Sequence, residues 1–341
     1  MNGSIIRYVL GHVIKLEAII LLLPFFVALI YGERDGFYFL FVAAVSYCLG
    51  FLVSFRKPSN MVFYLKEGCI ITALSWCVMS LVGCMPFYLS GAIPDIFNAL
   101  FETVSGFTTT GATVLSNVEA LSHCMLFWRS LTHWIGGMGV LVFLLAIVPL
   151  TGGSNINLMR AESPGPSVGK FVPKIRQTAR MLYIIYLGLT AIQALLLLIA
   201  GAPAFDAINI ALATAGTGGF GVRNTSLADY SVAVQWITAI FMFLFGVNFN
   251  AYYFLLYGQA KKASIMEEVR IYGIVTLLSI LLIAINIYDV SRGVFGTITD
   301  SAFQVTSIIS STGFSTVDFE LWPSASKLIL VMLMFIGACA G

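Results

Sequence analysis

The stretch FTTTGAT, Phe107 to Thr113, lies between two long apolar segments and contains four threonines and one glycine. Similar stretches return later in the chain as TGGFG at 217–221 and STGFST at 311–316. None of the three carries an acid, a base or a thiol, so hydrolytic or metal chemistry does not explain them. Their return indicates a structural unit that the chain uses more than once.

Aligning the glycines of these stretches brings three longer segments into register. The segments are NALFETVSGFTTTGAT from Asn98, DAINIALATAGTGGFG from Asp206 and DSAFQVTSIISSTGFS from Asp300, aligned on Gly111, Gly219 and Gly313. Each begins with Asn or Asp thirteen residues before its glycine, and these residue types commonly cap helix N-termini. We therefore expect three helices of about ten residues, which are too short to cross a bilayer.

The composition places these helices in a membrane protein. The chain has 341 residues, of which 59% are hydrophobic and 10% charged, whereas soluble domains carry about a quarter charged residues. Uncharged runs long enough to span a bilayer lie at 36–55, 68–89, 130–150, 181–205, 231–260 and 271–288, a first span ends near Ile30, and a last begins after Lys327. The six cysteines form no C-x-x-C pair, which argues against disulfides or a metal site.

The order of the segments predicts the domain organisation. Each short helix lies between one span before it and another after it, so the repeated unit is span, re-entrant helix, loop, span. We predict an all-α integral membrane protein of potassium-channel type, with two leading transmembrane helices at 1–66 and pore repeats at 67–175, 176–267 and 268–341, the last one incomplete.

Loop charges predict the orientation. If the spans alternate, residues 1–17 and the loops 56–67, 151–180 and 258–270 share one side and hold 13 of the 18 Lys and Arg residues. An excess of basic residues marks the cytoplasmic face, so we expect a cytoplasmic N-terminus. The opposite side holds eleven of the sixteen acids, which would attract cations.

The re-entrant segments predict a cation path. Irregular backbone at membrane depth is tolerated where it lines a water-filled cavity, and a helix C-terminus aimed at that cavity favours a cation. Glycine permits the conformations that turn successive carbonyls to one side as ligands. One Ser/Thr/Gly cluster would more simply be a turn, but three with matching caps, glycines and spans favour the ion path.

At this point the residues resemble the superfamily of Trk, Ktr and HKT potassium transport proteins. The resemblance rests on TTTGAT at 108–113, ATAGTGGFG at 213–221, SSTGFST at 310–316 and FWRSLTHWIGGMG at 127–139. It covers essentially the whole chain and is greatest for the TrkH/TrkG branch, because two extra spans precede the first repeat.

The resemblance implies a filter that binds potassium mainly through backbone carbonyls, and no covalent chemistry. Carried over by position, the filter residues are Thr110, Gly111, Gly218, Gly219, Thr312 and Gly313, with Thr109, Thr217 and Ser311 one step deeper. Some relatives that favour sodium have serine where this chain has Gly111. The resemblance further implies a homodimer in the bacterial inner membrane and a cytosolic nucleotide-binding regulatory subunit similar to TrkA, with no cofactor beyond the transported ion and no nucleic acid.

The resemblance also implies a gate and a fourth repeat. In relatives a loop of small residues interrupts the second span of the third repeat below the filter, and Gly337 to Gly341 resemble the start of that loop. Because the sequence stops there, we expect it to be truncated before the fourth repeat.

Two charged residues and two rival functions remain open. Glu102 and Arg129 would form an ion pair between the short helix and the next span, or would reach water separately near the outer interface. GGMG at 136–139 is expected to allow close packing rather than to bind ions. The alternative functions are a secondary transporter that couples potassium to a proton or sodium gradient, and an intramembrane Ser/His/Asp enzyme.

Overall fold

The computed structural model describes residues 2–58, 65–139, 175–256, 258–259, 261, 265–288 and 293–338. Within these ranges every regular element is a helix, which confirms the predicted all-α class. The chain divides into two compact units, Met1–Tyr183 and Ile184–Gly341. The division falls inside one long helix, α10 (Ile175–Ile199).

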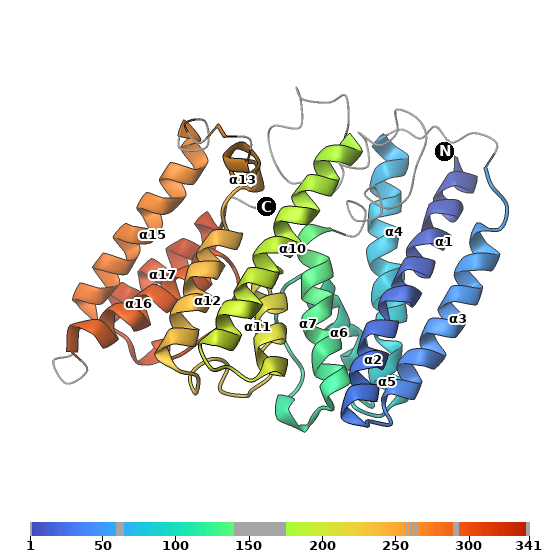
Figure 1. Cartoon of the computed structure of the whole chain (residues 1–341), viewed down its shortest axis with the longest axis horizontal. Coiled ribbons are helices and arrows are strands. Elements are labelled where there is room, and N and C mark those ends of the chain that lie inside the picture. Colours follow the sequence, from blue (N-terminus) through green and yellow to red (C-terminus); the bar gives the residue numbers. More distant parts are fainter. Residues whose placement is uncertain are drawn as a thin grey trace. The chain divides into compact units, whose positions relative to one another are not determined.

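Unit 1 holds the leading helices and the first of the three aligned segments (Figure 1). Its helices are α1 (Gly3–Ile20), α2 (Leu22–Tyr31), α3 (Gly36–Ser54), α4 (Leu65–Gly83), α5 (Met85–Leu89), α6 (Ile96–Phe107) and α7 (His123–Met138), with a 3₁₀ turn at Val118–Ala120. The short α6 packs against α4 and α7. The indole Nε1 of Trp128 on α7 donates to the Gly83 carbonyl at 2.9 Å, and its ring meets Phe107 edge to face.

Unit 2 holds the other two aligned segments. After α10 come α11 (Ala204–Ala215), α12 (Val232–Phe245), α13 (Phe249–Leu256), α15 (Glu267–Asn286), α16 (Gly293–Ile309) and α17 (Ser324–Ile336), with a 3₁₀ turn at Phe319–Leu321. The helix α16 packs against α12, α15 and α17, and α11 packs against α12. A short helix with a longer helix before and after it is therefore present in both units, as α6 and as α11; the third segment differs, since α16 is longer than α17.

Five helical stretches of the described chain are long and apolar enough to cross a membrane. They are Gly3–Tyr31, Gly36–Ser54, Lys66–Leu89, Arg180–Ile199 and Glu267–Asn286. The predicted span 181–205 ends too late, because α10 stops at Ile199 and Gly201 turns the chain with φ +89°. Of the predicted span 130–150, α7 covers the part up to Met138, and 140–150 lie outside the described residues.

The predicted continuous span 231–260 is wrong, because the helix bends by 91° between α12 and α13. At the bend a Cβ atom on Gly246 would clash with the hydroxyl of Tyr272, so the chain passes very close to α15. Asn248 then accepts a hydrogen bond from the Asn250 amide at 3.0 Å, as expected where a new helix starts. Hydropathy alone does not detect this bend, because both halves are apolar.

The predicted helix caps are also corrected. Asp95, not Asn98, caps α6 and accepts from the Asn98 amide at 2.8 Å. Pro203 precedes α11, and Asp206 lies in its first turn. The helix α16 begins at Gly293, so Asp300 lies inside it. The three helices have 12, 12 and 17 residues, so each is longer than the expected length of about ten. The predicted starts were wrong because Asn and Asp also occur inside helices.

Candidate functional site

The three aligned segments share one backbone conformation where their short helices end. The residue two before each aligned glycine is left-handed, with φ of 55° at Thr109, 52° at Thr217 and 58° at Ser311. The aligned glycines are also left-handed, with φ of 77°, 76° and 83° for Gly111, Gly219 and Gly313. The sequence alignment therefore corresponds to a conformation that is repeated residue by residue.

Backbone hydrogen bonds repeat in the same way. Each left-handed Thr or Ser donates its amide to the carbonyl three residues earlier, and the next residue donates to the carbonyl five residues earlier. These second bonds join Thr110 to Ser105 at 2.9 Å, Gly218 to Ala213 at 3.1 Å and Thr312 to Ser307 at 2.9 Å. The pair of bonds is a Schellman motif, which closes the C-terminus of a helix.

The residue type at this cap is unusual, because glycine normally takes the left-handed position of a Schellman motif. A left-handed conformation costs roughly 1–2 kcal/mol for a residue with a Cβ atom, and β-branched residues adopt it rarely. Thr109, Thr217 and Ser311 accept this cost in all three segments. Strain that the surrounding structure maintains is typical of functional sites.

The motif leaves the next carbonyl groups available. In the described part of the chain, no hydrogen bond ends on the carbonyl oxygens of Thr109 to Gly111, Thr217 to Gly219 or Ser311 to Gly313. The amides of the first two residues of each triplet are bonded back into their helix. Each segment thus presents a short run of unbonded carbonyl oxygens at the negative end of a helix dipole, an arrangement that suits a cation.

Two of the segments meet within unit 2. A Cβ atom on Gly219 would clash with the carbonyl oxygen of Thr312, so the second and third segments touch at their aligned positions. The loops that follow the two turns are also joined. Leu227 donates its amide to the Ser315 carbonyl at 3.0 Å, and Ser315 donates its amide to Ser226 Oγ at 3.2 Å. Sequence positions about ninety residues apart are thereby brought side by side.

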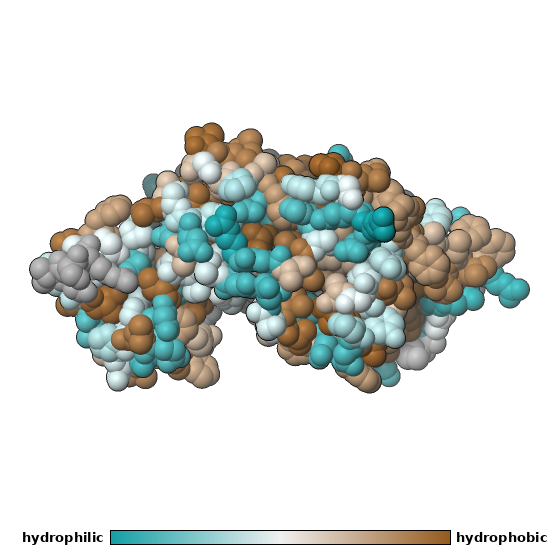
Figure 2. Space-filling view, turned by 90° about the horizontal axis from the view of Figure 1, so that it is seen from below, coloured by the Kyte–Doolittle hydropathy of each residue, from teal (hydrophilic) through white to brown (hydrophobic). Residues whose placement is uncertain are grey.

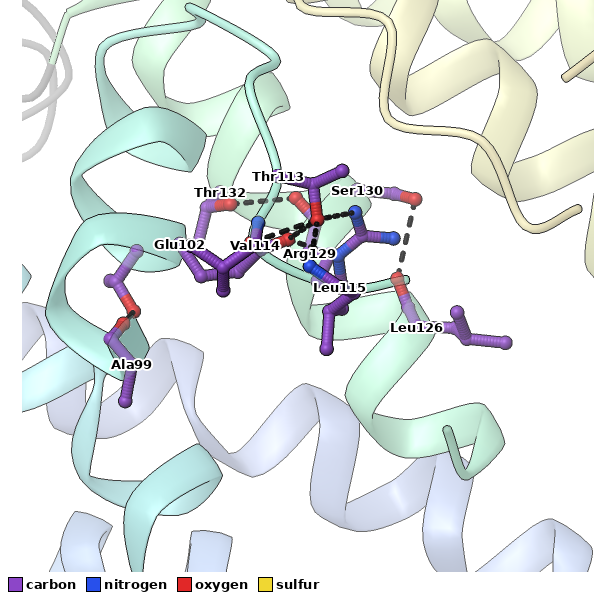
Figure 3. Close-up of polar contacts among 10 residues, drawn as sticks. Ala99, Glu102, Thr113, Val114, Leu115, Leu126, Arg129, Ser130 and Thr132 are labelled. Carbon is purple, nitrogen blue, oxygen red and sulfur yellow. Dashed lines mark hydrogen bonds and ion pairs between the residues drawn. The ribbon is translucent and has the colours of Figure 1, made fainter. Parts of the chain in front are cut away.

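In unit 1 a buried ion pair holds the first segment. Arg129 Nε lies 2.8 Å from Glu102 Oε1, and the two side chains are 2% and 0% exposed (Figure 3). The hydroxyl of Thr113 lies 2.9 Å from both carboxylate oxygens, and the Val114 amide donates to Oε2 at 3.0 Å. The predicted pair is confirmed, and the reading of two groups in separate contact with water is wrong. Glu102 joins α6, α7 and the strand that leaves the first segment.

The other two segments are held by different side chains. Gln304, nine residues before its glycine as Glu102 is, donates its amide to the Val317 carbonyl at 3.2 Å. Ile210 stands at the equivalent place in the second segment, and there Arg223 pairs instead with Asp206 at 3.2 Å. In each segment a polar side chain of the short helix therefore contacts the outgoing strand. The alignment could have shown that Glu102 and Gln304 occupy equivalent positions, whereas no local sequence pattern indicates that Arg223 holds the second segment.

GGMG packs closely, as predicted. A Cβ atom on Gly136 would clash with the Phe107 carbonyl oxygen at the end of α6. Of the predicted gate residues, Gly337 ends α17 with φ +65°, and Gly341 lies outside the described residues. The loop 151–174, expected on the cytoplasmic side, also lies outside them. Among the described residues no group of three or more His, Cys, Asp or Glu side chains is arranged to hold a metal ion.

A carboxylate outside the aligned segments caps α7. Glu33, in the loop between α2 and α3, accepts hydrogen bonds from the amides of His123 and Cys124 at 2.7 and 3.0 Å and contacts His123 Nδ1 at 2.8 Å. Partial burial works to raise the pKa of Glu33, but these hydrogen bonds outweigh it and lower the pKa below its usual value. Figure 2 shows the face that lies at the bottom of Figure 1, where hydrophilic residues lie among hydrophobic ones. The sequence reasoning missed this contact, because ninety residues separate its partners.

Comparison with known proteins identifies the family. The family model described as "TrkH: Cation transport protein" matches residues 37–341. The chain belongs to the TrkH family of cation transport proteins. The TrkH potassium uptake protein of Salmonella typhimurium is 35% identical over 352 residues, covering 100% of this chain and 72% of the relative. The TrkG protein of Escherichia coli is 31% identical, with the same coverage.

A solved structure supports the TrkH family fold. The crystal structure of the potassium transporter TrkH from Vibrio parahaemolyticus matches with a TM-score of 0.85 at 29% identity, covering 100% of this chain and 71% of that one. The apolar helices and the family together make this chain a multi-pass membrane protein. Members of the TrkH family are transporters, so the intramembrane enzyme is rejected.

Proposed function

We propose that the protein takes up potassium across the bacterial inner membrane through a filter of backbone carbonyls. The filter residues would be Thr110, Gly111, Gly218, Gly219, Thr312 and Gly313, with Thr109, Thr217 and Ser311 one step deeper. The proposal is carried by one observation: three helix ends share the same strained turn, and each is followed by carbonyl oxygens without hydrogen bonds in the described chain. The relatives' names as potassium uptake proteins support the choice of ion.

The mechanism follows from this chemistry. An entering ion loses its hydration shell, and oriented carbonyl dipoles replace the lost water ligands. The C-terminal ends of α6, α11 and α16 add a favourable dipole field. The strain at Thr109, Thr217 and Ser311 keeps the carbonyls oriented before the ion arrives, so little reorganisation is needed. No cofactor and no covalent step take part.

The proposal also includes the orientation of the protein in the membrane and its partners. The basic loops favour a cytoplasmic N-terminus. As in the relatives that the sequence resembles, we expect a homodimer and a cytosolic nucleotide-binding regulatory subunit similar to TrkA. Gly337 would begin the gate below the filter, since its left-handed backbone ends α17.

The test compares two glycines of nearly equal geometry. Gly313 has φ +83° and Gly201 φ +89°, and a Cβ atom would meet nothing within 4 Å at either. Serine therefore imposes similar backbone strain at both positions, but only Gly313 belongs to the proposed filter. In potassium-starved cells that express the protein, Gly313→Ser should lower rubidium uptake or let more sodium enter. Gly201→Ser should leave the uptake of both ions near that of the wild type. Equal uptake by the two variants would contradict the filter assignment.

A coupled carrier is the second candidate, and the bend between α12 and α13 favours it, because broken helices also form carrier sites. A carrier predicts saturable rubidium uptake that stops when the proton and sodium gradients are removed at constant membrane potential. The filter proposal predicts uptake that follows the membrane potential under the same conditions.

A further inference from the structure

One carboxyl group lies in the middle of the first membrane span. Glu17 has fourteen residues of the span Gly3–Tyr31 on either side of it. The charge count of the sequence placed this residue on the cytoplasmic side, but the structure leaves it 1% exposed. In the described part of the chain neither of its carboxylate oxygens has a hydrogen-bond partner.

The surroundings of Glu17 connect it to the helix that carries the first filter segment. A Cβ atom on Gly83 of α4 would lie 3.2 Å from Glu17 Oε1, and 3.1 and 3.0 Å from the side chains of Thr103 and Phe107 on α6. Phe107 is the last residue of α6. The carboxyl group therefore occupies the point where α1, α4 and α6 meet.

Among the residues that the structure describes, no basic side chain forms an ion pair with Glu17. The helix α3, which packs along α1, contains no Asp, Glu, Lys, Arg or His. On α6 and α7, Glu102 and Arg129 bond to each other. The other basic side chains on the packed helices are those of Arg7, His12 and Lys15 on α1, Lys66 on α4 and His123 and His133 on α7, and none of them bonds to either Glu17 oxygen in the described chain.

These observations indicate whether the Glu17 carboxyl group is protonated or ionised. An ionised carboxylate without a partner in an apolar interior is so costly that the group takes up a proton instead, and acids at membrane depth mark functional sites by default. We propose that Glu17 is a proton-binding site at the middle of the first span, neutral when occupied. Loss of its proton would place a bare charge against Gly83 and Phe107 and would disturb α6, which leads directly into Thr109 to Gly111.

A chemical test needs no assumption about transport. Dicyclohexylcarbodiimide partitions into apolar sites and reacts with protonated carboxyl groups. The acid proton moves to a carbodiimide nitrogen, the carboxylate oxygen bonds to the central carbon, and an acyl shift to nitrogen gives a stable N-acylurea that retains all atoms of both reactants. In the purified protein, Glu17 should carry the label by peptide mass spectrometry, and Glu17→Gln should lose it.

A matched control is Glu33→Gln, which removes a carboxyl that accepts hydrogen bonds from two backbone amides and should leave the Glu17 label unchanged. An unlabelled Glu17 in the wild-type protein would overturn the proposal. Since labelling does not depend on ion flux, this result is independent of whether the filter assignment holds.

The second test asks whether the proton matters for the proposed transport, and it rests on that function. Rubidium uptake is measured at fixed membrane potential from about pH 6 to about pH 9. Wild-type uptake should decline at the alkaline end, and Glu17→Gln, a neutral side chain of the same shape, should lose this decline. Parallel profiles for the two proteins would overturn the link between Glu17 and the first filter segment, even if the carboxyl group is labelled.

Discussion

The first and third aligned segments have the same turn but differ in the side chains that hold the chain after that turn. In the first, a fully buried ion pair between Glu102 and Arg129 bonds to Thr113 and Val114. In the third, the neutral amide of Gln304 reaches the Val317 carbonyl at 3.2 Å. The backbone conformation is thus maintained independently of the chemistry that braces it.

The difference has consequences for robustness. A neutral hydrogen bond can be lost at modest cost, whereas removal of one member of a buried ion pair leaves an unpaired charge. The second segment has the most exposed contact of the three, since Arg223 and Asp206 are 35% and 15% exposed and water can replace their contact. The first segment should therefore be the most sensitive to mutation of its brace.

The largest effect is expected from breaking the buried pair. Glu102→Ala removes the carboxylate that pairs with Arg129 and should cost about 3–5 kcal/mol of stability, and rubidium uptake should be lost because Thr113 and Val114 lose their anchor. Thermal unfolding of the purified protein measures the first effect. The double variant with Arg129→Ala should cost less than the two single variants added together; strict additivity would show that the pair is not coupled. The exposed Glu320→Ala serves as control.

A smaller effect is expected at the N-terminal cap of α7, where the partly exposed carboxylate of Glu33 can be compared with the buried carboxylate of Glu102. Glu33→Gln should cost about 0.5–2 kcal/mol at neutral pH, as lost helix caps do. Because hydrogen bonds lower the pKa of Glu33 in the folded protein, its contribution is complete above the unfolded pKa of about 4.3 and is lost as the pH falls through the folded pKa. Wild-type stability should thus approach that of Glu33→Gln in acid. A constant difference between the two melting curves would refute this.

The neutral brace should be weaker still. Gln304→Leu removes one hydrogen bond, worth about 0.5–1.5 kcal/mol, and should reduce rubidium uptake without abolishing it. The exposed Gln259 provides the control Gln259→Leu. If Gln304→Leu were as damaging as Glu102→Ala, the proposed contrast between the first and third segments would fail.

The smallest effect is expected in the second segment. Arg223→Gln should cost about 0.2–1 kcal/mol, because its ion pair is partly exposed and screened by water. Raising the salt concentration should diminish the difference between wild type and variant, whereas the Glu102→Ala defect should not respond to salt. Melting temperatures at low and high salt distinguish the two cases.

Sequence reasoning predicted the parts of this protein that depend on local composition. The apolar runs predicted the membrane helices, and the aligned Gly111, Gly219 and Gly313 marked positions that share one backbone conformation. Helix ends were less accurate, since Asn98 and Asp300 lie inside helices. The break between α12 and α13 was missed because hydropathy measures the environment of a segment and not its direction.

Glu17 shows the limit most clearly. In the sequence it is one of a few charged residues near the N-terminus, and only the packing of α1 against α3 and α4 leaves it buried with no hydrogen-bond partner among the described residues. The sequence by itself determined most of the membrane helices, the three repeated turns and the family, because hydropathy and the left-handed tendency of glycine act over a few residues. The tertiary structure decided which side chains hold the chain after each turn and which carboxyl group is buried in the apolar interior, because those contacts join positions far apart in the chain.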